Sequence, residues 1–398
     1  MKEAIAFVCE RPFSERDYHR FGAEILSKYF DVYFLDCSKI FRNSSNLPGS
    51  EDNNCLSNMA TYECFDTLPS LKNFLCGRQF AFYIDALGSN LLCLRIRLAF
   101  RASKVLRVKL NLGVLPWVTK PLGIIHKLRN LEMSGKLLPK IAKQLIARIV
   151  LRLEPKADVL VYSGSKSRLT GLRKRGLEIW AHSLDYQYYI DNKRVQKQFG
   201  TFKNYAVFID QYAPEHPDYS FHGNVAPVTA ARYYTSMNRF FDYFESEFGM
   251  RVIISIHPRC QMDPSKLWGK RTAILGKTPL LIQESRLVIS HYSTALSFAV
   301  LNRKPVLQVT TEEYENSYRR DQFVAFSEAL SIDTFNIDRE EQKLDLTDFL
   351  SVNEGAYSEY EELYLKSQYS VSKDIWNYTA QQLMKYSSSN TVEVLDEA

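Results

Sequence analysis

The sequence lacks the long apolar segments and paired cysteines that mark membrane-spanning and disulfide-bonded proteins. No window offers about 18 uninterrupted apolar residues. The chain enters its first apolar run, at residues 5–8, without the pattern of a cleaved signal. The seven cysteines are scattered and include no CxxC pair, which favours free thiols in a reducing compartment. We therefore expect a cytoplasmic protein.

Common catalytic signatures are absent as well. The chain has no GxxxxGK[ST] loop, no GxGxxG after its first predicted strand and no HExxH. These absences argue against the usual ATPases, dinucleotide enzymes and zinc peptidases. No group of Cys and His has the spacing of a metal site, so we predict no bound metal and no cofactor.

What the chain does have is the length and patterning of a two-domain α/β protein. Its 398 residues exceed what a single hydrophobic core usually organises. Short apolar runs alternate with helical patterns in both halves, which is typical of parallel sheets covered by helices. Strands are predicted at 4–8, 32–35, 80–84, 105–112, 159–162, 177–181, 206–209, 252–256, 287–289 and 305–307. Helices are predicted at 14–29, 91–103, 124–153, 230–248 and 295–301.

A polar, charged stretch at 191–203 separates the two halves. We therefore predict one Rossmann-like domain at 1–200 and a second at 201–372. Residues 373–398 are expected to form a C-terminal helix and an acidic tail, disordered after Ser387.

Positive charge is concentrated in one segment. Residues 91–156 contain fifteen Lys and Arg against only Glu132 and Glu154. This excess indicates an anionic partner such as a membrane surface or a phosphate-bearing acceptor, although a solvated helical face balanced elsewhere would look the same. No recognisable nucleic-acid module accompanies the charge, so we expect no nucleic-acid partner.

Polar clusters follow four predicted strands, and ligands of open α/β sheets bind at the carboxyl ends of strands. In His182-Ser183-Leu184-Asp185-Tyr186, the carboxylate of Asp185 is a candidate general base or a simple helix cap. Asp210-Gln211 with Glu215-His216 predicts an ordered loop carrying a site, or ordinary turn chemistry.

The other two clusters suit a phosphate. In His257-Pro258-Arg259, the imidazole and guanidinium can stabilise phosphate charge, although a lone histidine is more often structural. Ser290-His291-Tyr292-Ser293-Thr294 lies before a predicted helix, whose free N–H groups would cradle a phosphate or simply be capped by the hydroxyls.

Together the clusters resemble the bacterial sialyltransferases and polysialyltransferases of the GT-B fold, which use CMP-activated sugars. They resemble more closely a family of surface-carbohydrate (O-antigen and capsule) biosynthesis proteins. That closer likeness spans roughly residues 180–310 and also includes Gly276-Lys277-Thr278 and Ser293-Thr294-Ala295.

The resemblance implies a role for each cluster. Asp185 would be the catalytic base and His257 the partner of the leaving phosphate. The acidic-acidic-Gly pattern of the family is absent, because Tyr186 and Gln187 follow Asp185, so Asp210 competes for the role of base. The nucleotide-binding set would be His257, Pro258, Arg259, Lys277, Thr278, Ser290, His291, Ser293 and Thr294. The acceptor side would include His182, Tyr186, Gln211 and His216.

The implied fold is GT-B, with the parallel sheets of two Rossmann-like domains facing a central cleft. The first domain would bind the acceptor and the second the nucleotide sugar. The implied activity is metal-independent, inverting transfer of a nonulosonic acid (sialic, pseudaminic or legionaminic) or Kdo from a CMP-sugar to a glycan or lipid-linked glycan. A UDP- or GDP-sugar donor, a polyol-phosphate (teichoic-acid-type) transferase and a sugar-nucleotide epimerase are the alternatives. A peripheral position at the inner face of the cytoplasmic membrane would follow from the basic segment.

Overall fold

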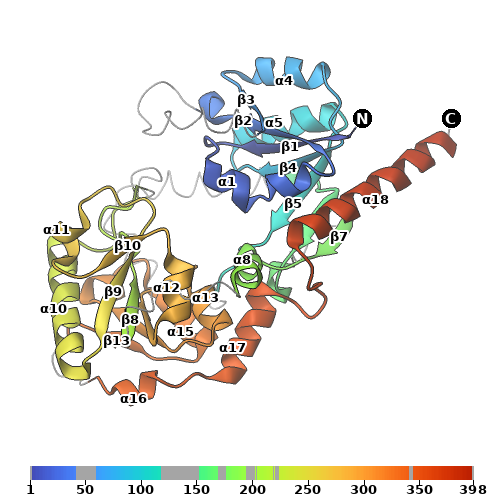
Figure 1. The fold of residues 1–398 in the computed structure, drawn as a ribbon. Coiled ribbons are helices and arrows are strands. Elements are labelled where there is room, and N and C mark those ends of the chain that lie inside the picture. The colour runs from blue at the N-terminus through green and yellow to red at the C-terminus, as the bar shows by residue number, and fades with distance from the viewer. Residues whose placement is uncertain are drawn as a thin grey trace. The chain divides into compact units, whose positions relative to one another are not determined.

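The computed structural model describes residues 2–41, 60–117, 152–168, 176–193, 202, 204–217, 219, 224–339 and 344–396. The chain divides into two compact units, each containing a parallel sheet (Figure 1). Unit 1 comprises Met1–Gly113, Ile125–Leu184 and Ser367–Ala398, and unit 2 comprises Val114–Ile124 and Asp185–Lys366. Among the described residues, no helix is both long and apolar enough to cross a membrane.

The described part of unit 1 contains a seven-stranded sheet in the order β3-β2-β1-β4-β5-β6-β7. Its strands are β1 (Ala4–Cys9), β2 (Asp31–Asp36), β3 (Thr61–Cys64), β4 (Phe82–Ala86), β5 (Leu106–Asn111), β6 (Val159–Tyr162) and β7 (Leu177–Trp180). Its helices are α1 (Glu15–Arg20), α2 (Ala23–Leu26), α4 (Leu68–Cys76), α5 (Leu91–Ala102) and α18 (Ile375–Asp396). All neighbouring strands run parallel.

Alternate side chains of the central strands enter two separate cores. Ile5 and Phe7 of β1 pack with side chains of α1, α2 and α18, whereas Ala6 and Val8 pack with side chains of α4 and α5. Successive residues of a strand point to opposite faces. The uninterrupted apolar run of β1 is therefore the pattern of a strand covered by helices on both faces.

The described part of unit 2 contains a six-stranded parallel sheet in the order β10-β9-β8-β11-β12-β13. Its strands are β8 (Tyr205–Ile209), β9 (Arg251–Ile256), β10 (Ala273–Leu275), β11 (Leu287–Ser290), β12 (Val306–Thr310) and β13 (Thr334–Asn336). The helices are α8 (Leu184–Asn192), α10 (Ala230–Phe248), α11 (Pro264–Trp268), α12 (Thr278–Glu284), α13 (Leu296–Leu301), α14 (Glu312–Glu315), α15 (Arg320–Leu330), α16 (Leu346–Phe349) and α17 (Glu354–Tyr360).

Both sheets share one winding pattern. In each, the first strand lies inside the sheet, the next two extend to one side, and the chain then returns to the other side. This is the strand order of the Rossmann fold, whose ligands bind where the order reverses. The prediction of two Rossmann-like α/β domains is confirmed. The reversals lie between β1 and β4 in unit 1 and between β8 and β11 in unit 2.

The C-terminal segment differs from its expectation. α18 continues to Asp396, so the disorder expected after Ser387 is wrong, and Trp376 and Leu383 of this helix are buried in unit 1. The chain passes from unit 1 to unit 2 at Leu184 and Asp185. The boundary expected between residues 200 and 201 falls within 194–201, outside the described residues.

The described part of the basic segment contains both paired and exposed cations. Arg97 and Arg107 are buried, and each contacts Asp85 and Glu154 in a network of ion pairs. These two arginines are therefore structural, because their charge is neutralised within unit 1. The predicted helix at 124–153, with Lys140, Lys143 and Arg148, lies almost wholly outside the described residues.

Candidate functional site

Three of the four polar clusters lie at one edge of the sheet of unit 2. Asp210 follows β8, His257 follows β9 and His291 follows β11. These three strands are neighbours in the order β9-β8-β11, and they run parallel. Their carboxyl ends therefore bring the clusters together where the strand order reverses, which is the ligand-binding position of this topology.

Asp210 fastens two of the loops at this edge. Its carboxylate accepts the backbone N–H of Tyr212 at 2.8 Å and that of His257 at 3.4 Å. Burial, with only 3% of the residue exposed, raises its pKa to about 6, and the backbone donors oppose that shift. A carboxylate so enclosed holds the turn of His257 in place. Asp210 is therefore better placed to position His257 than to contact an acceptor directly.

His257 is oriented by its own turn. Its Nδ1 accepts the backbone N–H of Arg259 at 3.2 Å, so the neutral ring carries its proton on Nε2. The ring lies 4.8 Å from that of His216, at 68°. Two imidazoles, from the loops after β8 and β9, thus lie side by side. Imidazole nitrogens can donate and accept hydrogen bonds, so the pair brings polar ring groups to this edge.

A row of aromatic rings leads from these histidines to an arginine. His216 contacts Tyr219, with 5.9 Å between ring centroids. The Arg319 guanidinium lies 5.9 Å from the ring of Tyr219 and 5.8 Å from that of Tyr292, which follows β11. Arg319 directly precedes α15. It is a candidate anion-binding residue that the sequence analysis missed.

The residues after β10 join the same edge. Thr278 begins α12, and its hydroxyl hydrogen-bonds the Ser255 hydroxyl of β9 at 2.6 Å. Lys277, Pro258 and Arg259 are exposed. Their roles in nucleotide binding stay predictions.

His291, expected to bind nucleotide, lies in the core of unit 2. It is 0% exposed, Nδ1 lies 2.6 Å from the carbonyl oxygen of Val309, and Nε2 lies 2.9 Å from the Tyr233 hydroxyl. Its Nδ1–H therefore donates to Val309, and Nε2 accepts from Tyr233. Burial lowers its pKa to about 4. Both ring nitrogens have partners within the core, so His291 is placed as a structural histidine, and its expected role in nucleotide binding stays a prediction.

The phosphate cradle expected before α13 also differs from the structure. The backbone N–H groups of Leu296, Ser297 and Phe298 donate to the carbonyl oxygens three residues earlier, and that of Ala295 donates to the Ser293 hydroxyl at 3.2 Å. This tight turn satisfies the N–H groups that the cradle requires. Ser293 therefore caps the turn, Ser290 is buried in β11, and Thr294 is exposed.

The cluster that follows β7 is divided between the two units. His182 is fully buried, and its Nε2 lies 2.9 Å from the Lys373 carbonyl oxygen within unit 1. This contact connects the end of β7 to the segment before α18, so His182 is structural rather than part of an acceptor surface. Asp185 and Tyr186 belong to unit 2 and are partly buried. Asp185 lies in the first turn of α8, where a carboxylate is favoured by the helix dipole.

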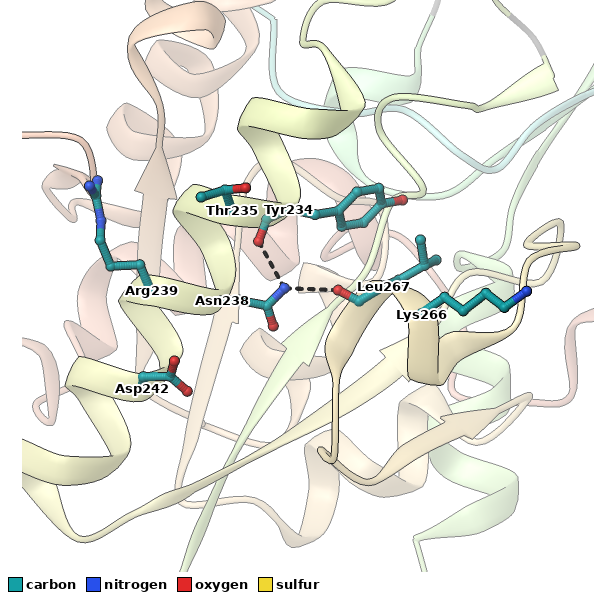
Figure 2. Close-up of a pocket in the computed structure, with 7 residues that line it drawn as sticks. All are labelled: Tyr234, Thr235, Asn238, Arg239, Asp242, Lys266 and Leu267. Atoms are coloured by element: carbon teal, nitrogen blue, oxygen red, sulfur yellow. Dashed lines mark hydrogen bonds between the residues drawn. The ribbon is translucent and has the colours of Figure 1, made fainter.

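A hollow of about 540 Å³ lies on the surface of unit 2, and Figure 2 shows residues that line it. Its lining comes from α10 and α11, and Asn238 donates to the carbonyl oxygens of Tyr234 and Leu267, each at 2.8 Å. The Tyr234 hydroxyl donates to Glu215 in the loop after β8 at 3.0 Å. The hollow therefore borders that loop, but its lining does not include the histidine pair.

No protein-family model and no curated protein matches the sequence. Among solved structures, the wall teichoic acid polymerase TagF aligns with 98% of this chain and 90% of its own, at a TM-score of 0.54 and 11% identity. A UDP-glucosyltransferase from Polygonum tinctorium aligns with 97% of this chain and 98% of its own, at a TM-score of 0.52 and 11% identity. MurG from Acinetobacter baumannii aligns with 96% of this chain and 99% of its own, at a TM-score of 0.47 and 8% identity.

The first two of these likenesses, with the paired Rossmann-like units, show that the chain has the GT-B fold of glycosyltransferases. The predicted fold class is confirmed. The narrower likeness to sialyltransferase-type enzymes rests on the sequence motifs and stays a prediction.

Proposed function

We propose that the chain is a glycosyltransferase that binds a nucleotide-activated sugar at the carboxyl edge of the sheet of unit 2. The observation that carries this proposal is the convergence of His257, His216 and Arg319 at the strand-order reversal. Cationic and proton-donating groups at that position suit a phosphate-bearing ligand. The acceptor would be a glycan or lipid-linked glycan of the cell surface.

For the donor we propose a CMP-linked nonulosonic acid or Kdo, on the strength of the sequence motifs. Transfer would occur by a single displacement with inversion at the anomeric carbon, with protein groups such as His257 and Arg259 neutralising the leaving phosphate instead of a metal. Of the two candidate bases, Asp185 is the better choice, because Asp210 is buried and accepts two backbone N–H groups. Asp210 would position His257.

Thermal unfolding with a panel of nucleotides tests the donor. A ligand present at 100 times its dissociation constant adds about 2.7 kcal/mol of stability. We expect CMP to raise the melting temperature and UDP, UMP and GDP to leave it unchanged. A rise with UDP or GDP alone would contradict the CMP donor and keep the transferase. No response to any nucleotide would contradict the transferase itself.

A second candidate is transfer of a polyol phosphate. The adjacent imidazoles of His216 and His257 favour it, because one could take the proton of an attacking hydroxyl. Solved structures of TagF that align with this chain include two histidine variants, H548A and H444N, and an H444N form soaked with CDPG. Stabilisation by CDP with no response to CMP, together with a phosphodiester product, would favour this candidate.

We also propose a peripheral position on an anionic membrane. One face of α5 exposes Leu91 (59%) and Leu98 (46%) beside the exposed Arg95 and Arg101. Each basic residue near an anionic surface contributes about 1 kcal/mol. Reversing both charges as R95E/R101E should therefore weaken co-sedimentation with anionic liposomes by at least about tenfold. The matched variant R251E/K270E changes two exposed residues of unit 2 and should bind liposomes like the wild type. Equal binding by all three proteins would exclude this face of α5 as the membrane contact.

A further inference from the structure

Arg319 carries a half-buried positive charge that has no ion-pair partner among the described residues. Its guanidinium lies near the rings of Tyr219, Tyr292 and Tyr318, at 5.9, 5.8 and 5.0 Å. Nη1 donates to Gln322 at 3.1 Å, whereas Nε is buried and has no hydrogen-bond partner in the described part of the chain. A strong donor is thus shielded from water without an acceptor.

An anion would supply the acceptor that Nε of this half-buried guanidinium lacks among the described residues. Buried charges in proteins are normally paired, as the buried Arg97 and Arg107 of unit 1 are paired with carboxylates. Cation–π contacts offset only part of the cost, up to about 2 kcal/mol. Burial raises the pKa of Tyr219 and Tyr292. Their hydroxyls therefore stay protonated at neutral pH and supply no counter-charge.

A second unsatisfied group lies at the same strand edge. Oε1 of Gln211, in the loop after β8, is also buried without a partner among the described residues. Unsatisfied buried polar groups are few in native proteins, and a bound water, ion or ligand is a common partner for them. The donor Arg319 Nε and the acceptor Gln211 Oε1 are two groups of this kind at the carboxyl edge of the sheet, where the hydroxyl of Ser290 at the end of β11 is another. The first two would be explained by a ligand that carries an anionic group and a hydrogen-bond donor.

We infer that Arg319 binds the phosphate of a nucleoside phosphate, at the end of the aromatic row opposite His257. The inference deepens the proposed function by naming a recognition residue of the donor site. In the transfer, the bond between the anomeric carbon and the phosphate oxygen breaks, and its electron pair stays on that oxygen. The acceptor oxygen bonds to the anomeric carbon and loses its proton to the base. A fixed guanidinium stabilises the charge that develops on the leaving phosphate.

Binding measurements on Arg319→Gln test this role, with Arg320→Gln as the matched control. Arg320 is the next residue along the chain and is exposed, so both variants lose one positive charge from the same segment. The probes are cytidine, CMP and inorganic pyrophosphate, titrated calorimetrically into the full chain. R319Q should bind CMP about 10- to 100-fold more weakly than the wild type, and cytidine equally well. R320Q should match the wild type for all three probes.

A third variant separates charge from structure. Arg319→Lys keeps the charge and loses the planar fork, so its affinity for CMP should lie between those of the wild type and R319Q. Equal weakening of cytidine and CMP in R319Q would mean that Arg319 only supports the fold, and unchanged CMP binding would likewise overturn the inference.

Pyrophosphate distinguishes this inference from the proposed function. If the wild type binds pyrophosphate but no nucleotide, and R319Q loses that binding, the anion site stands and the nucleotide-sugar transferase falls. If the wild type binds CMP and R319Q binds it equally, the proposed function stands and the inference falls. A wild type that binds neither CMP nor pyrophosphate overturns both the inference and the CMP donor.

Discussion

His257→Asn is expected to lower the rate of transfer by about 10²- to 10³-fold while the protein remains folded. The asparagine oxygen can replace Nδ1 as the acceptor for the Arg259 backbone N–H, so the turn after β9 is retained. It cannot replace the donor Nε2–H of the neutral ring. Losing one donor to developing negative charge typically costs that factor in kcat. Steady-state kinetics with the donor that the nucleotide panel identifies would measure the effect.

The matched control is His19→Asn, on an exposed side chain of α1 in unit 1. It makes the same chemical change away from the site, so its kcat should equal that of the wild type. Activity of H257N within about threefold of the wild type would remove His257 from the reaction. A large fall in its melting temperature would show instead that the histidine supports the fold.

The strands that could be predicted from sequence are those buried on both faces. All residues of β6, β8, β11 and β12 are buried, and their continuous apolar runs produced correct predictions. The strands that were missed are β3, β10 and β13, which are sheet edges. Each has three or four residues, most of them partly exposed. The edge strand β7 was nevertheless predicted, because its four residues include Leu177, Ile179 and Trp180, so what the missed strands lack is a sufficient apolar run.

The length of α18 was missed for a different reason. The acidic tail after Ser387 was expected to be disordered. In the helix, Ser388 and Ser389 donate their hydroxyls to the carbonyl oxygens four residues earlier, at 3.0 and 2.9 Å. Serine can satisfy its side chain in this way without breaking a helix, so composition alone was a poor guide.

Sequence position located the edge of the candidate site but not the role of each residue at it. The rule that ligands bind at strand carboxyl ends correctly brought Asp210 and His257 together. It could not separate His257 from the structural His291, because both follow buried strands. Only the packing of Tyr233 and Val309 against the ring distinguishes them.

Arg319 could not be singled out from the sequence, because the adjacent Arg320 is the same residue type in the same local sequence. What selects Arg319 is its contact with Tyr219 and Tyr292, which lie far from it along the chain. Such a contact exists only once the loops after β8 and β11 have been brought together by the sheet.

Asp210 and His291 are expected to make opposite contributions to stability between pH 4 and pH 6.5. Burial raises the pKa of Asp210 from 3.8 to about 6, so its contribution is present below pH 3.8 and is lost as the pH rises through 6. Burial lowers the pKa of His291 from 6.5 to about 4, so its contribution is present above pH 6.5 and is lost as the pH falls through 4. Each amounts to about 3 kcal/mol, because one pKa unit corresponds to about 1.4 kcal/mol.

In the wild type the two contributions nearly cancel, and single variants should reveal them. In Asp210→Asn, the free energy of unfolding should fall by about 3 kcal/mol more than in the wild type as the pH drops from 6.5 to 4. In His291→Asn, it should rise by a similar amount over the same interval. Denaturant unfolding at a series of pH values would measure both slopes, and the double variant should again follow the wild type.

Each single substitution also destabilises by about 1–3 kcal/mol through its lost hydrogen bond, but that cost does not change with pH. Parallel pH profiles for all four proteins would therefore contradict the assignment of Asp210 as a buried, protonatable anchor and of His291 as a neutral core histidine.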